Sequence, residues 1–458
     1  MPAIGTTPPA IRSGRSVPRR IGRGETTAVG AQPALGHESA TADRISYPIL
    51  AAVFFSCYIL WRPSDDILFT VSDAFFMMGL YTLVIRGRIP LEPLRFFTPF
   101  WIAGFAMVAV GLLIGSISCP TPLRWLIVAG QYLFAWVVLP MILLRRGEKA
   151  TVALLKAFIW GVFAMNLFGA FMVFTYHGSF SQAHDLLGRN FITGDHRLGA
   201  FVGDANWDGA MLAMAVPMVF FLRSKQEIGN ILASIWLAVL VLGVVLTASF
   251  TAFIDCVAAI AIFFAAGGIR VQPRTALLVT AILALASILY FGNGGTLPQI
   301  FVNRVGNAIG SGDIDQAGTF VGRMALIREA WSIADHHLFI GLGADQYRVV
   351  SVYQAPVHNM YLLLWAEGGL IAMFGWVLMQ AVILAAAVKA YPRDHVAAAL
   401  TLSVATTFLI SSTASPHMYA RLWPVPVLLA LAVSIEAVVD PGHTLRRRVV
   451  LKRAQVDY

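Results

Sequence analysis

Long apolar runs alternate with short polar segments along most of the chain. Twelve runs approach the roughly 20 residues that a helix needs to cross a bilayer core. The pattern predicts an all-α polytopic membrane protein with about 12 transmembrane helices between residues 46–440, flanked by a disordered tail at 1–45 and a basic tail at 441–458. The predicted spans are residues 47–61, 67–85, 97–115, 125–144, 153–175, 208–222, 230–247, 251–268, 275–291, 360–388, 397–414 and 423–438.

Composition supports this class of protein. Of the 458 residues, 58% are hydrophobic and 12% are charged, about half of the ~25% charge that a soluble domain carries. This balance excludes a cytosolic enzyme, a secreted disulfide scaffold and a disordered protein. The three cysteines form no recognisable disulfide or metal-binding pattern.

The basic residues orient the predicted helices. With a cytoplasmic N-terminus, 23 of the 33 Lys and Arg residues fall on inside segments, nine fall on outside segments, and Lys156 lies within a span. Because short cytoplasmic loops are enriched in Lys and Arg, both termini are predicted to be cytoplasmic. The net charge of +9 is therefore a topology signal, and a nucleic-acid partner is not expected.

Two of the predicted outside segments, residues 176–207 and 292–357, are too long to be simple turns. Long loops in compact proteins are usually functional, so chemistry on the outer face should be built from these two. The larger one lies between predicted helices nine and ten, and both are predicted to be periplasmic.

The first loop ends in a polar, glycine-containing stretch that runs from Arg197 to Asn206. Gly199 and Gly203 permit tight backbone geometry, and either Asp204 or Asn206 can cap the helix that follows. An arginine near a span often extends its head to the lipid headgroups, so the residue alone does not establish a functional role for Arg197.

The second loop contains a predicted amphipathic helix. Its apolar residues are Phe320, Met324, Ile327, Trp331 and Ala334, and its wet face carries Arg328, Ser332 and Asp335. Arg323 instead projects along the apolar stripe. Since an unpaired buried charge is costly, Arg323 should either pair with a loop acid such as Asp313 or Asp315 or bind an anion.

Further candidates surround the tenth predicted span. His358 stands at its start, where a helix N-terminus disfavours a protonated imidazole, as suits a general base. A simple interfacial histidine is the alternative. Glu367 follows within the span, where carboxylates are functional candidates by default.

Together these motifs resemble the O-antigen ligase and polymerase superfamily of bacterial inner-membrane enzymes. The resemblance rests on Arg197 to Asn206, Gly322-Arg323, Trp331, Gly341-Leu-Gly343, His358-Asn359-Met-Tyr361 and Glu367-Gly-Gly369. It is strongest over residues 190–390. The chain departs from many members by lacking a proline before Asn206 and by reading Ala-Ser-Phe-Thr after the seventh span.

The resemblance implies transfer of a glycan from undecaprenyl diphosphate to a saccharide acceptor, such as lipid A–core or a growing polymer, without a cofactor or metal. It implies catalytic roles for Arg197, Arg323 and His358. Two arginines would hold the departing diphosphate, and the histidine would accept the acceptor's proton with inversion at the anomeric carbon. Substrate-binding roles are expected for Asn206, Gly341, Gly343, Asn359 and Glu367. Of these, Asn359 and Glu367 would support the residues that contact the substrate.

Alternatives to a ligase remain open at this stage. A repeat-unit polymerase of the same superfamily would share every one of these motifs. A secondary transporter would account for Asp73, Lys156, Asp255 and Glu367 within spans, although no internal repeat is visible. Asp313-Ile-Asp315 has the form of a cation-binding motif, but its glycine-rich setting favours a solvated loop.

The topology generates a first prediction. A reporter that is active only in the cytoplasm should be inactive when it is fused after residue 310, because residues 292–357 should face the periplasm. The same reporter fused within residues 441–458 is the positive control. Activity of the fusion after residue 310 would overturn the assignment of the site to the outer face.

Overall fold

The computed structural model describes residues 46–60, 69–176, 178–268, 298–311, 320–416 and 418–439. The chain divides into two units, residues 1–41 and 42–458, and the described residues all belong to the second unit. Within them the chain is helical, and an isolated antiparallel bridge joins Ile192 and Leu198. The prediction of an all-α protein is confirmed for this part of the chain.

Eleven of the twelve predicted spans coincide with helices, and the span at 275–291 lies outside the described residues. The helices are α1 (Tyr47–Phe54), α2 (Val71–Ile85), α3 (Thr98–Ile117), α4 (Arg124–Leu133), α5 (Leu139–Leu143), α6 (Glu148–Thr175), α7 (Phe180–Leu187), α8 (Ala205–Ser224), α9 (Asn230–Thr247), α10 (Phe250–Gly267), α12 (Gln299–Phe301), α13 (Asn307–Ser311), α14 (Phe320–His336), α15 (Tyr347–Val350), α16 (Met360–Ala390), α17 (His395–Ser412) and α18 (Pro424–Val439). Among the described helices, eight are long and apolar enough to cross a membrane and three apolar ones are shorter. The total of twelve therefore stays a prediction.

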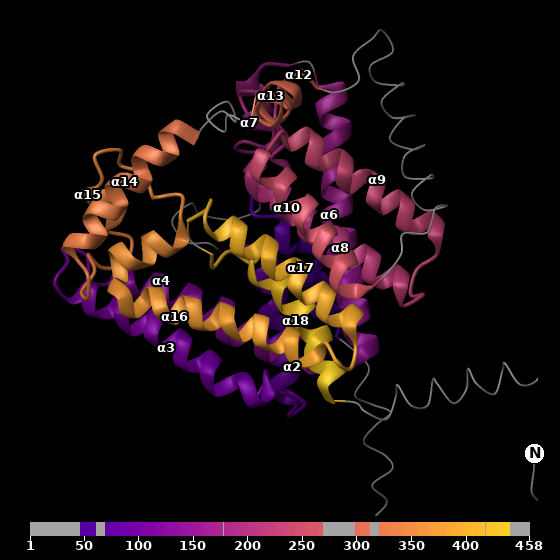
Figure 1. The fold of residues 1–458 in the computed structure, drawn as a ribbon, viewed down its shortest axis with the longest axis horizontal. Coiled ribbons are helices and arrows are strands. Elements are labelled where there is room, and N and C mark those ends of the chain that lie inside the picture. The colour runs from indigo at the N-terminus through magenta and orange to yellow at the C-terminus, as the bar shows by residue number, and fades with distance from the viewer. Residues whose placement is uncertain are drawn as a thin grey trace, which may run out of the picture. The chain divides into compact units, whose positions relative to one another are not determined.

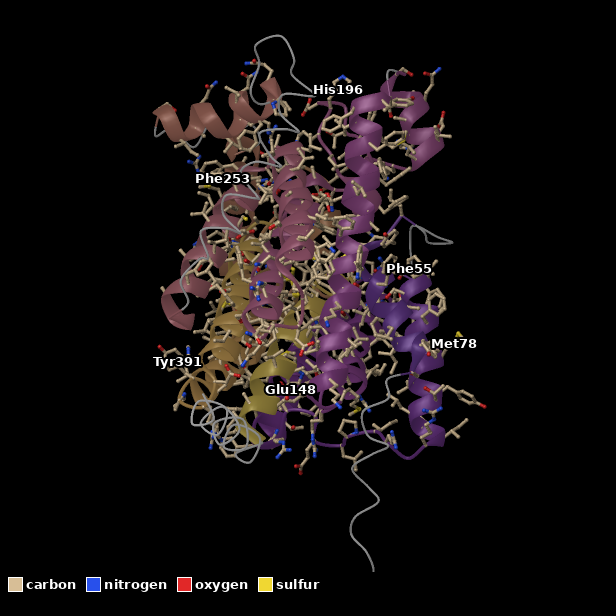
Figure 2. The ribbon with its side chains drawn as sticks, turned by 90° about the vertical axis from the view of Figure 1, so that its right-hand side faces the viewer. Phe55, Met78, Glu148, His196, Phe253 and Tyr391 are labelled. Atoms are coloured by element: carbon tan, nitrogen blue, oxygen red, sulfur yellow. The ribbon has the colours of Figure 1, made fainter. Side chains whose placement is uncertain are left out.

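The long helices run between two ends of this unit. Figure 2 shows His196 at one end and Glu148 and Tyr391 at the opposite end. This arrangement agrees with the prediction that residues 176–207 lie across the helices from the basic segments near residues 145–149 and 389–393. The assignment of the two ends to membrane faces stays a prediction. We call the end that carries His196 the loop end.

Small residues bring α3 and α16 into close contact along their length (Figure 1). A Cβ atom on Gly111 would lie 2.5 Å from the carbonyl oxygen of Gly368, and one on Gly104 would lie 2.8 Å from that of Gly375. Helices in lipid depend on such close backbone packing, because hydrocarbon surroundings remove the hydrophobic drive for association.

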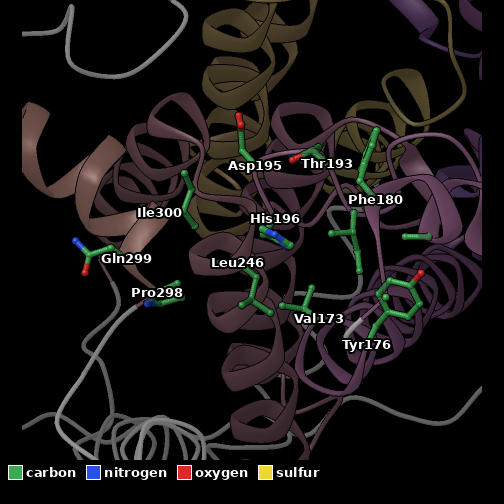
Figure 3. A pocket seen from close by; sticks show the side chains of 13 residues that line it. Val173, Tyr176, Phe180, Thr193, Asp195, His196, Leu246, Pro298, Gln299 and Ile300 are labelled. Atoms are coloured by element: carbon green, nitrogen blue, oxygen red, sulfur yellow. The ribbon is translucent and has the colours of Figure 1, made fainter.

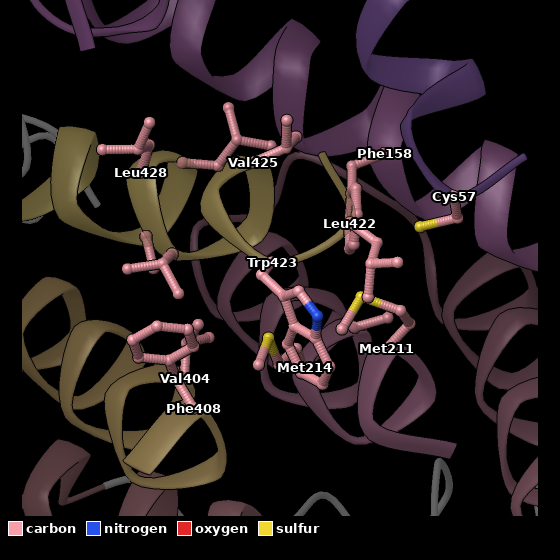
Figure 4. Packing of buried hydrophobic residues seen from close by; sticks show 14 of the residues in the cluster. Cys57, Phe158, Met211, Met214, Val404, Phe408, Leu422, Trp423, Val425 and Leu428 are labelled. Atoms are coloured by element: carbon pink, nitrogen blue, oxygen red, sulfur yellow. The ribbon is translucent and has the colours of Figure 1, made fainter. Parts of the chain in front are cut away.

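Helix α8 forms the centre of the unit. Its most apolar stretch is 83% buried, and Met211 and Met214 pack around the fully buried indole of Trp423, which also contacts Phe408 of α17 (Figure 4). Because α8 begins at the end of the first long loop, its burial fixes the position from which that loop leaves the helices.

The amphipathic helix α14 packs against α16 through a narrower stripe than the sequence predicts. Leu326, Ala330 and Ala334 are buried against α16, whereas Trp331 is 57% exposed and its ring meets that of Trp365 edge-on at 5.3 Å. The expectation that Trp331 belongs to the buried face is therefore wrong. Small alanines let the two helices approach closely, which leaves the large indole at the margin of the contact.

Candidate functional site

Arg197 is fixed by hydrogen bonds to two helix ends, and its partner Asn206 extends the contact to a third. It is only 7% exposed; its Nε donates to the carbonyl oxygen of Thr247 at 2.8 Å, and its Nη2 donates to Oδ1 of Asn206 at 2.9 Å. The hydroxyl of Ser249 donates to the same Asn206 oxygen at 2.8 Å. The guanidinium thus joins the end of α9 to the starts of α8 and α10. These contacts exclude a solvent-facing snorkelling arginine.

A small hairpin presents Arg197 to these partners. Thr193 N–H donates to the Arg197 carbonyl at 2.9 Å, and Arg197 N–H donates to Oγ1 of Thr193 at 3.1 Å. Leu198 N–H then donates to the carbonyl of Leu246 at the end of α9 at 2.9 Å. The arginine is therefore held by backbone on both sides, as a site requires if its geometry must persist.

The turn into α8 follows the local prediction. Gly203 has a φ of 73°, which favours glycine, and Asp204 Oδ1 accepts from the N–H groups of Asn206 and Trp207 at 2.8 and 3.0 Å. Asp204 is thus the cap of α8, and Asn206 is free to bind Arg197 instead.

Arg323 enters the site from α14, which is tied to the loop that follows it. Glu329 accepts hydrogen bonds from the hydroxyls of Tyr347 and Ser351 at 3.0 and 2.7 Å, and from Val352 N–H at 2.7 Å. Arg323 itself is partly buried and makes no hydrogen bond or ion pair with another described residue. Its suggested partners, Asp313 and Asp315, lie outside the described residues.

His358 is held immediately before α16. Asn359 caps this helix, with its Oδ1 accepting from Leu362 N–H at 3.1 Å, and the preceding Val357 is fully buried. The imidazole of His358 is partly buried and has no hydrogen-bond partner among the described side chains and backbone. Asn359 is thus a helix cap that positions its neighbour.

Electrostatic effects show that these residues, which are distant in sequence, form one group. The pKa of Arg197 is lowered to about 10, mainly by burial and then by the charges of Arg304 and Arg323, while the carboxylates of Asp204 and Asp195 oppose the shift. Burial also lowers the pKa of His358 from its usual 6.5, with the charge of Arg323 acting in the same direction and that of Asp204 opposing it. A neutral imidazole is therefore favoured beside Arg323.

Arg304 belongs to the same group, although its sequence context gave no sign of it. It lies in a π-helical turn, Val302–Gly306, where its side chain is 12% exposed and its Nη1 is 4.0 Å from Oδ2 of Asp195. The pKa of Arg323 is lowered, and burial is the largest cause. The charge of Arg304 acts in the same direction, and the charge of Asp204 opposes it. The Nε of Arg304 is buried without a partner in the described part of the chain. We call Arg197, Arg304 and Arg323 the cationic group, and His358 is the neighbouring imidazole on which Arg323 acts.

Glu367, Gly341 and Gly343 form a separate buried junction. The carboxylate of Glu367 accepts from Asp345 N–H and Tyr347 N–H at 3.0 and 3.1 Å, and its carbonyl accepts from Gly343 N–H at 2.8 Å. A Cβ atom on Gly341 would lie 2.2 Å from the carbonyl carbon of Glu367. No hydrogen bond or ion pair among the described residues joins Glu367, Gly341 or Gly343 directly to Arg197, Arg304, Arg323 or His358, so the predicted substrate-binding role stays a prediction. The contacts show that this junction anchors the loop between α14 and α15.

The charges that suggested a transporter have structural partners. Asp73 pairs with buried Arg421, and Lys156 pairs with Glu227 at 3.2 Å. Asp255 accepts a hydrogen bond from Ser411 at 3.0 Å. Asp255 therefore joins α10 to α17, and Asp73 joins α2 to the turn before α18, which weakens the main argument for an ion pathway.

The arrangement defines a multi-pass membrane protein in which loop residues gather three arginines and a histidine of lowered pKa at one end of the helices. Residues 233–377 match the family model described as O-antigen ligase, which confirms the resemblance to that superfamily. The matched segment includes Arg304, Arg323 and His358 and leaves Arg197 outside it. No curated protein matches the chain.

The electrostatics generate a second prediction. Asp204→Asn should preserve the cap of α8, because asparagine is an equally good cap, while removing the one charge that raises the pKa of His358. The pKa of His358 should therefore fall further. It can be measured from the pH dependence of diethyl pyrocarbonate modification, with His358→Gln identifying the signal.

The matched control for this experiment is Asp185→Asn on α7, which removes an exposed carboxylate from the same loop. This change should leave the midpoint of His358 modification in place. Equal midpoints in wild type and Asp204→Asn would separate Asp204 from the histidine.

Proposed function

We propose that the protein is an inner-membrane glycosyltransferase of the O-antigen ligase type. It moves a polysaccharide from undecaprenyl diphosphate to an acceptor sugar, such as that of lipid A–core, without a metal and with inversion. The observation that carries this proposal is the convergence of Arg197, Arg323 and His358, from three separate segments, within a chain that matches the family.

The arginines suit a departing diphosphate. Cleavage of the sugar–phosphate bond concentrates negative charge on the leaving group, and fixed cations stabilise charge that grows in the transition state. Arg197 uses Nε and Nη2 for the protein, so it supplies a fixed charge and its remaining N–H groups. Arg323 is not engaged by other described residues, so its fork is available for two phosphate oxygens.

His358 is the proposed base. Its neutral imidazole accepts the proton of an acceptor hydroxyl as that oxygen attacks the anomeric carbon. The bond between this carbon and the diphosphate oxygen breaks, and the bonding electrons leave with the diphosphate. A single displacement of this kind inverts the anomeric configuration.

A repeat-unit polymerase would use the same residues, with a second lipid-linked glycan as its acceptor. Gel analysis of lipopolysaccharide from a deletion strain separates the two functions. Unlinked polymer together with bare core indicates a ligase, whereas core bearing a single repeat unit indicates a polymerase.

The third prediction concerns Arg323. Arg323→Lys keeps the charge but loses the planar fork, so it should reduce transfer from lipid-linked glycan by about 10-fold or more, the effect of losing roughly 1.5–3 kcal/mol of charge-assisted hydrogen bonding. Arg328→Lys, on the exposed face of the same helix, should be nearly silent. Equal losses in both variants would reduce Arg323 to a structural residue.

The fourth prediction concerns His358. His358→Ala should lower turnover by roughly 10²–10⁴-fold, the usual contribution of a positioned acid–base group, while undecaprenyl diphosphate still binds. A base must be neutral to act, and the pKa of His358 is lowered from 6.5. The wild-type rate should therefore hold at neutral pH and fall only on an acidic limb below pH 6.5.

Transfer from purified donor to acceptor in detergent, measured against pH, tests this prediction, with folding of each variant confirmed by thermal unfolding. His337→Ala, a histidine of the same loop that bonds its own helix at Ile333, is the control. Near-normal turnover of His358→Ala, or a flat acidic profile in wild type, would make His358 an interfacial histidine.

A further inference from the structure

A cavity of about 420 Å³ opens at the loop end, beside the hairpin that carries Arg197. In Figure 3, Tyr176 and Phe180 lie on one side and Gln299 on the opposite side, with His196 between them. Its volume falls within the roughly 300–1,000 Å³ that is typical of small-molecule sites. None of the residues predicted from the sequence to bind substrate lines it.

The lining mixes two kinds of surface. Thr193, Asp195, His196 and Gln299 offer hydrogen-bonding side chains, while Tyr176 and Phe180 offer aromatic rings. A sugar can use both kinds of surface. Its hydroxyls form hydrogen bonds with polar side chains, and its C–H faces pack on apolar or aromatic groups. A polyprenyl chain could form no hydrogen bond with these polar side chains.

The cavity is joined to the cationic group by two features. Asp195 lines the cavity, and its carboxylate is 4.0 Å from Nη1 of Arg304. The hairpin that contributes Thr193 and His196 to the cavity also holds Arg197 through two hydrogen bonds. A group bound in the cavity therefore sits next to whatever anion the arginines hold.

The charge of the lining also indicates which part of a substrate enters. Asp195 places a carboxylate at the cavity wall, and the described lining contains no lysine or arginine. A phosphate would be repelled there and attracted to the neighbouring arginines instead. The arginines thus form a positively charged site beside a cavity whose wall carries a carboxylate. A phosphorylated end of a substrate suits the arginines, and an uncharged sugar suits the cavity.

We propose that this cavity is a saccharide subsite that holds a short segment of glycan beside the diphosphate position. The proposal rests on the proposed function for the identity of its neighbour, while the cavity's own lining defines the ligand class. The segment belongs either to the lipid-linked donor or to the acceptor, and the kinetic experiment below separates these two sources.

Two variants alter the cavity without touching the cationic group. His196→Asn suits the backbone, because His196 has a φ of 56° and asparagine tolerates that conformation. Gln299→Ala removes a side chain that also donates to Oδ1 of Asn303 at 2.8 Å. The matched controls are His395→Asn, an exposed histidine at the start of α17 that does not line the cavity, and Asn303→Ala, which breaks the same hydrogen bond but leaves the cavity lining unchanged.

The full chain in nanodiscs is assayed with purified lipid-linked glycan and acceptor, and binding is measured with the oligosaccharide released from that donor and with undecaprenyl diphosphate. Each cavity variant should raise one KM about 5- to 10-fold, the effect of one lost hydrogen bond, with little change in kcat. A rise in the donor KM, with weaker binding of the released oligosaccharide, assigns the cavity to the donor glycan. A rise in the acceptor KM alone assigns it to the acceptor.

Binding of undecaprenyl diphosphate should be unchanged in every cavity variant and control. Unchanged values of both KM and of oligosaccharide binding in His196→Asn and Gln299→Ala would overturn the subsite, whatever the arginine and histidine variants do. Absence of transfer in wild type would instead remove the proposed function. In that case oligosaccharide binding that depends on His196 and Gln299 supports the subsite, and binding that does not depend on them overturns it.

Discussion

The geometry of the loop end depends on the hydrogen bond from Arg197 to the carbonyl of Thr247. The last carbonyls of a helix lack partners within it and carry partial negative charge, so a buried guanidinium at the end of α9 is stabilised by the helix that it completes. Through Asn206 and Ser249 the same contact fixes the starts of α8 and α10. One side chain thereby sets the relative positions of three helices and of the loop above them.

Around this contact the protein gathers more positive than negative charge. Arg197, Arg304 and Arg323 influence one another, while Asp204 and Asp195 are the acids that face them among the described residues. The pKa of Arg197 stays near 10 despite burial, so the repulsion is present at neutral pH. An anionic ligand would relieve this repulsion. Burial and the charge of Arg323 also lower the pKa of the neighbouring His358.

Local patterns predicted much of this. Apolar run length predicted the spans, and helical spacing predicted the position of Arg323. Capping rules narrowed the cap of α8 to Asp204 or Asn206, and the structure shows Asp204. Arg304 and the cavity could not be predicted, because they depend on which distant segments pack together, and no local pattern records that. Glu367 was predicted to support substrate, yet its carboxylate is occupied by backbone N–H groups. A carboxylate within an apolar run indicates that a partner exists, but it does not identify that partner.

The burial of α8 has a consequence for how the protein is made. Among the eight long apolar helices, α8 has the lowest mean hydropathy and the largest share of buried residues in its apolar stretch, because its neighbours are other helices. Such a segment enters the bilayer weakly by itself, since insertion depends on its own apolarity. Helix α17, one of its main packing partners, is synthesised about 170 residues later. Biogenesis must therefore shelter α8 until the C-terminal helices emerge, so chains truncated before α17 should be substrates for membrane quality control.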